Sequence, residues 1–284
     1  MITRRQFLQG FLGVTAVTAF TGYYTFRIEP YWVKFEKRVL PIRNLPAKLE
    51  GKTVVQISDI HIGSEIDSDF LSKQLRRVKE LSPDFVVYTG DFISYQTGEQ
   101  LLQLSQVMQH APLGQLGTAA VLGNHDYGHG WQQSEVADEL IKRVSDVGIP
   151  VLRNEVRSFA GLNFAGIDDF WGTNYAPEAI TAVLDPTHPT IMLCHNPDVV
   201  DQPVWNGYQG WILSGHTHGG QVKPPFLPPP MLPVRNKLYT SGVFDLEDGR
   251  FLYINRGLGS LMSVRFNARP EVTIFTLTTQ QTAA

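Results

Sequence analysis

The chain has 284 residues, of which 43% are hydrophobic and 18% are charged, and these values fit one globular domain with an N-terminal extension. The net charge of -3 argues against a protein that holds nucleic acid on a basic face. Cys194 is the only cysteine, which excludes an intramolecular disulfide. Its position at the end of an apolar run predicts a small core residue.

The first 26 residues differ in character from the rest of the chain. Arg4 and Arg5 precede residues 11–26, which contain no charged side chain. This pattern resembles a twin-arginine export signal, and the alternative is a short amphipathic helix that carries two arginines. About sixteen apolar residues are short for a membrane span of roughly 20. We therefore divide the chain into a signal or membrane anchor, residues 1–29, and a folded domain, residues 30–284.

The signal predicts an exported protein that contacts the membrane through its N-terminal segment. Its basic end should stay on the cytoplasmic side, which places the folded domain in the periplasm or on the outer face of the cytoplasmic membrane. Removal of the segment is left open, because Val17-Thr18-Ala19 is a mediocre cleavage site. No protein partner is predicted.

Apolar runs and stripes indicate an α/β fold. Residues 33–39 alternate in polarity and predict a strand with one solvated face. Buried strands are predicted at residues 54–58, 85–90, 119–123, 190–194 and 211–214. Helices are predicted from the stripe between Phe70 and Leu81 and from the stripe between Val136 and Val147, which Gly148 closes. Shorter strands at residues 162–167, 252–255 and 272–277 predict a β-richer second half.

Each of the five buried strands ends in a residue that can bind a metal ion. These residues are Asp59 with His61, Asp91, Asn124 with the following His125 and Asp126, His195, and His216 with His218. Five of the eight histidines lie in these motifs. Because ligands gather beyond the carboxyl ends of strands in open α/β sheets, the pattern predicts one composite metal site.

The motifs Asp59-x-His61, Gly90-Asp91, Gly123-Asn124-His125-Asp126, His195 and Gly215-His216-x-His218 together resemble those of the calcineurin-like metallophosphoesterases. The resemblance covers roughly residues 50 to 278. It implies a four-layer αββα sandwich, in which two mixed sheets are flanked by helices. It also implies two divalent metal ions, the first held by Asp59, His61, Asp91 and His218, and the second by Asp91, Asn124, His195 and His216. Donors without a thiolate favour Mn, Fe or Zn.

The resemblance further implies the chemistry of the site. A metal hydroxide would attack phosphorus, and His125 would protonate the leaving oxygen while Asp126 orients its ring; the alternative is that His125 is a turn residue. Two divalent ions bring four positive charges, and Asp59, Asp91 and a bridging hydroxide remove three. About one positive charge would remain to attract an anionic ester.

The stretch from Asn255 to Glu271 resembles the exported phosphodiesterases of YaeI type. We predict hydrolysis of phosphodiester or pyrophosphate bonds, with lipid-linked esters among the candidate substrates. The alternatives are a phosphomonoesterase, a UDP-diacylglucosamine pyrophosphatase-like enzyme, and a metal-bound scaffold without catalysis. Arg256, Arg265 and Arg269 are predicted to form structural pairs rather than substrate contacts. The loop Pro224–Pro233 is either a packing loop or an apolar rim that meets an acyl chain or the membrane.

Overall fold

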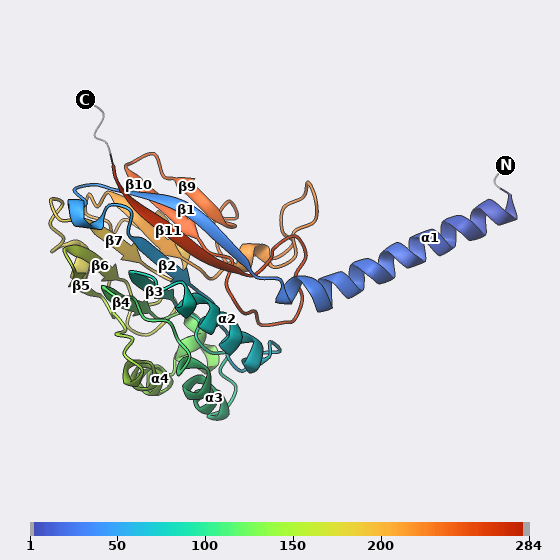
Figure 1. The fold of residues 1–284 in the computed structure, drawn as a ribbon, viewed down its shortest axis with the longest axis horizontal. Helices are drawn as coiled ribbons and strands as arrows, with labels where there is room; N and C mark the ends of the chain where they lie inside the picture. The colour runs from blue at the N-terminus through green and yellow to red at the C-terminus, as the bar shows by residue number, and fades with distance from the viewer. Residues whose placement is uncertain (1–2, 281–284) are drawn as a thin grey trace.

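A computed structural model describes residues 3–280 and contains two sheets packed face to face (Figure 1). The first sheet has the order β1-β11-β2-β3-β4, and its strands are β1 (Lys34–Ile42), β2 (Thr53–Ile57), β3 (Phe85–Thr89), β4 (Gly117–Val121) and β11 (Glu271–Thr279). The second has the order β5-β6-β7-β8-β10-β9, and its strands are β5 (Glu155–Phe159), β6 (Leu162–Gly166), β7 (Thr190–Leu193), β8 (Gly210–Ser214), β9 (Gly242–Asp245) and β10 (Arg250–Ile254). Both sheets mix parallel and antiparallel pairs.

Three of the predicted buried strands form the centre of the first sheet. Strands β2, β3 and β4 are parallel, with Val55 opposite Val86 and Val86 opposite Thr118. The two predicted helices are α2 (Ser68–Glu80) and α4 (Ser134–Asp146). A third helix, α3 (Glu99–Met108), lies between β3 and β4 and was not predicted. The three helices cover the outer face of this sheet (Figure 1).

Three apolar clusters separate the layers. One packs α2, α3 and α4 against the outer face of the first sheet, through residues such as Leu75, Leu104 and Leu140. A second fills the space between the sheets, where Phe85 of β3 meets Phe164 of β6 at a ring centroid distance of 5.6 Å. The third lies on the outer face of the second sheet. This layering confirms the predicted sandwich.

The outer layer on the second sheet is thinner than the layer on the first. Its helices are α5 (Glu178–Thr181) and the 3-10 turn η6 (Pro197–Asp201). The buried Trp205 fills part of the space left by these short elements. Cys194 lies in the same cluster with 1% of its surface exposed, which confirms its prediction as a core residue.

The N-terminal helix α1 (Arg4–Tyr23) extends away from the two sheets, and none of its residues is buried (Figure 1). Among residues 3–280, no helix combines the length and apolar character that crossing a bilayer requires. Contacts with the main body begin directly after α1, in η1 (Tyr24–Ile28), where the Thr25 carbonyl accepts a hydrogen bond from the Arg265 amide at 3.0 Å. Glu29 is buried, and its carboxylate accepts a hydrogen bond from the Ala268 amide.

Candidate metal centre

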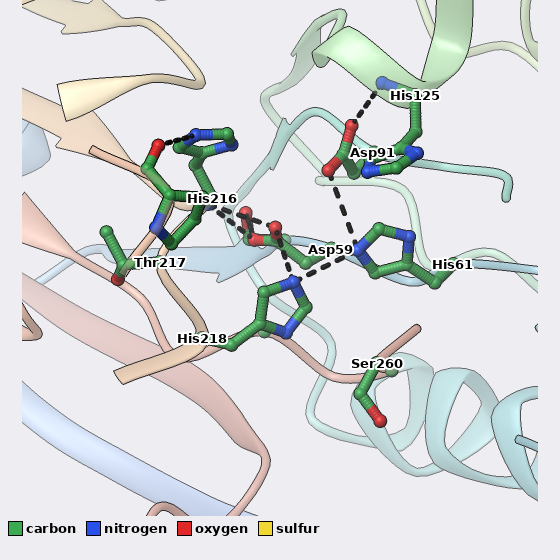
Figure 2. Close-up of polar contacts among 12 residues, drawn as sticks. Asp59, His61, Asp91, His125, His216, Thr217, His218 and Ser260 are labelled. Atoms are coloured by element: carbon green, nitrogen blue, oxygen red, sulfur yellow. Dashed lines mark hydrogen bonds and ion pairs between the residues drawn. The ribbon is translucent and has the colours of Figure 1, made fainter. Parts of the chain in front are cut away.

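The polar strand ends predicted to form one site lie together at the carboxyl edges of both sheets (Figure 2). Strands β2, β3 and β4 of the first sheet lead into Asp59 with His61, Asp91, and Asn124. Strands β7 and β8 of the second sheet lead into His195 and into His216 with His218. All seven side chains are buried, although they come from segments up to 159 residues apart.

The backbone is strained at five of these seven positions. The residues with positive φ are Asp59 (50°), His61 (51°), Asp91 (53°), His216 (72°) and His218 (51°). Asp and His enter this region more readily than most residues, but each such position still costs on the order of 1–3 kcal/mol. Strain concentrated on one set of polar side chains indicates that their convergence is functional.

The first ligand group contains Asp59, His61 and His218, which offer ligand atoms that all lie within 4.8 Å of one another. The Nε2 atoms of His61 and His218 approach to 3.0 Å. His218 Nε2 also lies 3.3 Å from Asp59 Oδ1. Figure 2 shows the three side chains pointing toward a common centre.

The second ligand group contains Asp91, His195 and His216 within the same 4.8 Å limit. His195 Nε2 lies 3.1 Å from Asp91 Oδ2 and 3.2 Å from His216 Nδ1. Asp91 Oδ2 also lies 3.5 Å from His61 Nε2, so Asp91 connects the two groups. Asn124 Oδ1 is buried without a hydrogen-bond partner among the described residues, as expected of an atom reserved for an ion.

The outward nitrogens of three histidines are held by hydrogen bonds. His61 Nδ1 pairs with Ser94 Oγ at 3.0 Å, His195 Nδ1 pairs with the Thr89 carbonyl at 2.8 Å, and His216 Nε2 pairs with the Pro233 carbonyl at 2.8 Å. The Thr89 and Pro233 carbonyls can only accept a hydrogen bond, so His195 Nδ1 and His216 Nε2 carry a proton. The Ser94 hydroxyl holds the orientation of the His61 ring, and the inner nitrogen of each of the three rings points toward the ligand groups. The donor set therefore fits two divalent ions.

Burial and neighbouring charges set the protonation of the centre. Burial holds the pKa of His61 well below its usual value, and burial together with the charge of His195 lowers the pKa of His216 to about 3. Burial would raise the pKa of Asp91, but the opposing charges of His195 and His125 bring it well below its usual value. The negative charge of Asp91 also overcomes the burial of His195 and raises the pKa of His195 well above its usual value. The ionised carboxylate attracts a cation, and His195 must release a proton when it binds one.

His218 differs from the other histidines because its outer nitrogen faces a guanidinium. Arg265 is fully buried, and its Nη2 atom lies 3.4 Å from His218 Nδ1. The guanidinium donates to the carbonyls of Arg256, Gly259 and Ala268. Burial lowers the pKa of Arg265 to about 10, so it keeps its charge at neutral pH.

The other two arginines of the C-terminal stretch also make structural contacts, as predicted. Arg256 forms an ion pair with Glu271 at 2.6 Å. Arg269 donates to the Trp32 carbonyl and lies 3.9 Å above the centroid of the Trp32 ring.

The two predicted catalytic residues have different surroundings. The His125 ring is half-buried and has no hydrogen-bond partner among the described residues, while its backbone amide donates to Asp91 Oδ1 at 2.9 Å. Asp126 is fully buried and makes no hydrogen bond with the His125 ring among the described residues; its carboxylate accepts hydrogen bonds from the amides of Phe92, Ile93 and Gly123. The prediction that Asp126 orients His125 is therefore wrong, because both carboxylate oxygens of Asp126 accept hydrogen bonds from backbone amides in the loops that follow β3 and β4.

Three residues near the centre were missed. Trp131 and Trp171 stack on each other, and their rings lie beside His125 and His216 respectively. No local sequence pattern predicted that these two tryptophans lie near the centre. Asp169 is buried, and its Oδ1 accepts a hydrogen bond from the Trp171 amide at 2.8 Å. A signal for Asp169 existed, because the run from Phe164 to Ile167 ends in Asp168-Asp169 in the same way as the five predicted strands.

Comparison with known proteins identifies the family. Residues 52–220 match the calcineurin-like phosphoesterase family. The chain belongs to this family. It is 33% identical to the uncharacterized metallophosphoesterase YkuE of Bacillus subtilis, over 97% of this chain and 98% of that protein. It is 31% identical to the phosphodiesterase YaeI of Escherichia coli, over 98% of this chain and all of that protein.

A third relative has a different named activity. The chain is 31% identical to the UDP-2,3-diacylglucosamine pyrophosphatase LpxG of Chlamydia trachomatis, over 81% of this chain and 85% of that protein. Family membership, these relatives and the two buried ligand groups make the chain a metal-dependent phosphoester hydrolase with a dinuclear site.

The Ser94 hydroxyl offers a test of the ligand geometry without removal of a ligand. We expect Ser94→Ala to weaken metal binding by about 10- to 100-fold, because the His61 ring loses the hydrogen-bond partner that holds its orientation. Titration of the metal-free protein with Mn or Zn, followed by calorimetry, measures this change. Ser134→Ala, which removes a hydroxyl that pairs with Thr173 rather than with a ligand, is the control. Unchanged affinity in the Ser94 variant would contradict the proposed use of His61.

Proposed function

We propose that this calcineurin-like metallophosphoesterase is a dinuclear phosphodiesterase that hydrolyses phosphodiester or pyrophosphate bonds, with His125 as the general acid. Asp59, His61, Asp91 and His218 would hold one ion, and Asp91, Asn124, His195 and His216 would hold the other. Mn, Fe and Zn suit these oxygen and imidazole donors.

The observation that carries the proposal is the position of the His125 ring. It lies 5.2 Å from the His61 ring, between centroids, at the edge of the ligand groups. Unlike the four ligand histidines, it is partly exposed and makes no hydrogen bond among residues 3–280. An imidazole ring that lies near the metal centre, and that neither belongs to the ligand groups nor makes a hydrogen bond within the described chain, can donate a proton to a departing oxygen.

These positions assign separate roles to the metal ions, Asp91 and His125. When bound, two divalent ions supply an activated water and polarise the phosphoryl oxygens. Asp91 lies close to histidines of both ligand groups, and its Oδ1 accepts a hydrogen bond from the His125 backbone amide. The backbone of the proposed general acid is therefore held at a fixed position relative to the metal centre. His125 then delivers the proton at a ring nitrogen, and no protein nucleophile is needed.

A diester suits the charges around the site better than a monoester. A monoester carries an extra negative charge and usually needs additional basic contacts. Arg256 and Arg269 are engaged in structural contacts, and Arg265 donates to backbone carbonyls behind His218. Because these arginines already have structural partners, they are not free to bind the extra charge of a monoester, and this supports a phosphodiesterase over a phosphomonoesterase.

Lipid-linked esters are the substrate class that we propose, and an apolar surface beside the centre supports this choice. The loop Pro224–Pro233 packs on the His-x-His turn, where Pro229 lies against Gly220, and the Pro233 carbonyl accepts the His216 hydrogen bond. Its side chains Phe226, Leu227 and Met231 are 106%, 61% and 72% exposed. The loop therefore contacts a ligand residue while presenting apolar surface to the solvent.

Hydrolysis of synthetic esters tests the proposed reaction. The full chain, stripped of metal and reloaded with Mn or Zn, should cleave bis-p-nitrophenyl phosphate faster than p-nitrophenyl phosphate. His125→Ala should lower diester turnover by roughly 10² to 10⁴, the usual size of an acid-base contribution, while both ions stay bound. The alanine variant keeps the backbone amide that contacts Asp91, so the ligands should remain in place.

His188→Ala is the matched control for His125, because His188 is an exposed histidine paired with Asp185 away from the ligands. It should retain wild-type turnover. Metal loss in His125→Ala would show that its role is misassigned. A preference for the monoester would favour a phosphatase, and no turnover with two ions bound would favour a non-catalytic scaffold.

The apolar loop offers a separate test of the substrate class. Replacing Phe226, Leu227 and Met231 with serine should reduce hydrolysis of a phospholipid in mixed micelles by at least about tenfold, because full burial of even one apolar side chain contributes on the order of 1.5–3 kcal/mol to transfer from water. Hydrolysis of bis-p-nitrophenyl phosphate should change by less than about twofold. An equal loss on both substrates would exclude a lipid-selective role.

We also propose export by the twin-arginine route, with the catalytic domain in the periplasm or on the outer face of the cytoplasmic membrane. Arg4 and Arg5 precede the uncharged part of α1, and no residue of the helix is buried. Replacing both arginines with lysine should leave most of the protein in the cytosolic fraction, as measured by fractionation and immunoblotting. An unchanged distribution between cytosol and envelope would argue against this route.

A further inference from the structure

Two tryptophans form a stacked pair beside the metal centre. The rings of Trp131 and Trp171 have a centroid distance of 4.9 Å and an interplanar angle of 15°. The Trp131 ring lies 6.2 Å from the His125 ring, and the Trp171 ring lies 4.7 Å from the His216 ring, both in edge-to-face orientation. The pair therefore extends from the proposed acid to a residue of the second ligand group.

Two separate loops hold the pair in position. Trp131 lies in the turn η5 (His129–Trp131) after β4, and Trp171 lies in the loop after β6. Gln132 Nε2 donates to the Trp171 carbonyl at 3.1 Å, and the Trp171 amide donates to Asp169 Oδ1 at 2.8 Å. The loop after β4 of the first sheet carries one indole and the loop after β6 of the second sheet carries the other, so the pair bridges the two sheets beside the site.

The backbone at Trp131 is strained. Trp131 has a φ of 61°, which is unusual for a bulky residue, and Gly130 before it has a φ of 63°. Such a conformation costs on the order of 1–3 kcal/mol and concentrates at ligand-binding positions. Trp131 nevertheless remains 36% exposed, so burial alone does not account for its placement.

The chemistry of the pair suits one part of a phosphodiester. Indole rings carry no charge and offer flat faces, which stack on aromatic rings. They are therefore poorly suited to the phosphoryl group and well suited to an organic substituent. A departing oxygen must come within hydrogen-bond reach of His125 to be protonated, and the group attached to that oxygen then lies beside Trp131.

We propose that Trp131 and Trp171 form the subsite for the leaving group and favour substrates whose departing alcohol carries a flat aromatic ring. The inference rests on the proposed role of His125, because that role defines which half of the diester departs next to Trp131. In this proposal the two indoles determine substrate specificity and do not bind metal.

Three diesters separate the leaving group from the retained group. Methyl p-nitrophenyl phosphate and phenyl p-nitrophenyl phosphate share a flat leaving group and differ in the group that is retained. Bis(2,2,2-trifluoroethyl) phosphate has a leaving group without a ring. In Trp131→Ala, kcat/KM should fall by about 10- to 100-fold on both p-nitrophenyl esters and by less than about threefold on the trifluoroethyl ester.

Two further variants control for folding and for a general loss of tryptophan. Trp131→Phe keeps a flat ring and should stay within about threefold of the wild type on all three esters. Trp32→Ala removes a half-exposed tryptophan that packs against Arg269 away from the ligand groups, and it should leave the three rates unchanged. An equal loss on all three esters in Trp131→Ala, with metals retained, would overturn the proposal.

A binding measurement decides the inference without turnover. Phenol and cyclohexanol are matched leaving-group analogues, since only phenol has a flat ring. Calorimetry should show that Trp131→Ala weakens phenol binding about fivefold or more and leaves cyclohexanol binding unchanged. If the wild type bound two metals but cleaved no diester, the proposed function would fail, and this comparison would still support or overturn the aromatic subsite. Equal weakening of both ligands would overturn it.

Discussion

The buried carboxylate of Asp91 is the interaction on which the centre depends. It is 1% exposed and lies within 3.5 Å of imidazole nitrogens from both ligand groups. An ionised carboxylate removed from water costs several kcal/mol unless opposite charges and hydrogen bonds compensate it. The strand order β2-β3-β4 explains why Asp91 has this position: it follows the middle strand, so Asp59 and Asn124 arrive from its two sides.

Much of the fold and the ligand set could be predicted because the relevant signals are local. An apolar run followed by Asp, Asn or His marks the end of a strand within a short stretch of sequence, and parallel strands bring such ends to one edge of the sheet. The partners of those ligands could not be predicted in this way. Ser94, the Pro233 carbonyl and Arg265 reach His61, His216 and His218 through contacts between segments 17 to 47 residues apart.

The same distinction explains the error at Asp126 and the missed tryptophans. Asp126 is a carboxylate next to His125 in the sequence, as expected of a residue that orients a catalytic imidazole. However, the loops after β3 and β4 contain buried backbone amides that need acceptors, and Asp126 supplies them. Trp131 and Trp171 meet only because β4 and β6 belong to sheets that pack against each other. Neither the amides nor the facing sheet is visible in a local pattern.

Assembly of the centre also bears on the proposed export route. Asp59, Asp91 and Asn124 follow strands of the first sheet, whereas His195 and His216 follow strands of the second. Neither sheet carries a complete ligand set for both ions, so the sheets must pack before the strained ligand positions can be stabilised by metal binding. A chain that acquires its ions only after folding is suited to a route that moves folded proteins. The ligand topology is compatible with such a route, and the export proposal itself rests on Arg4 and Arg5.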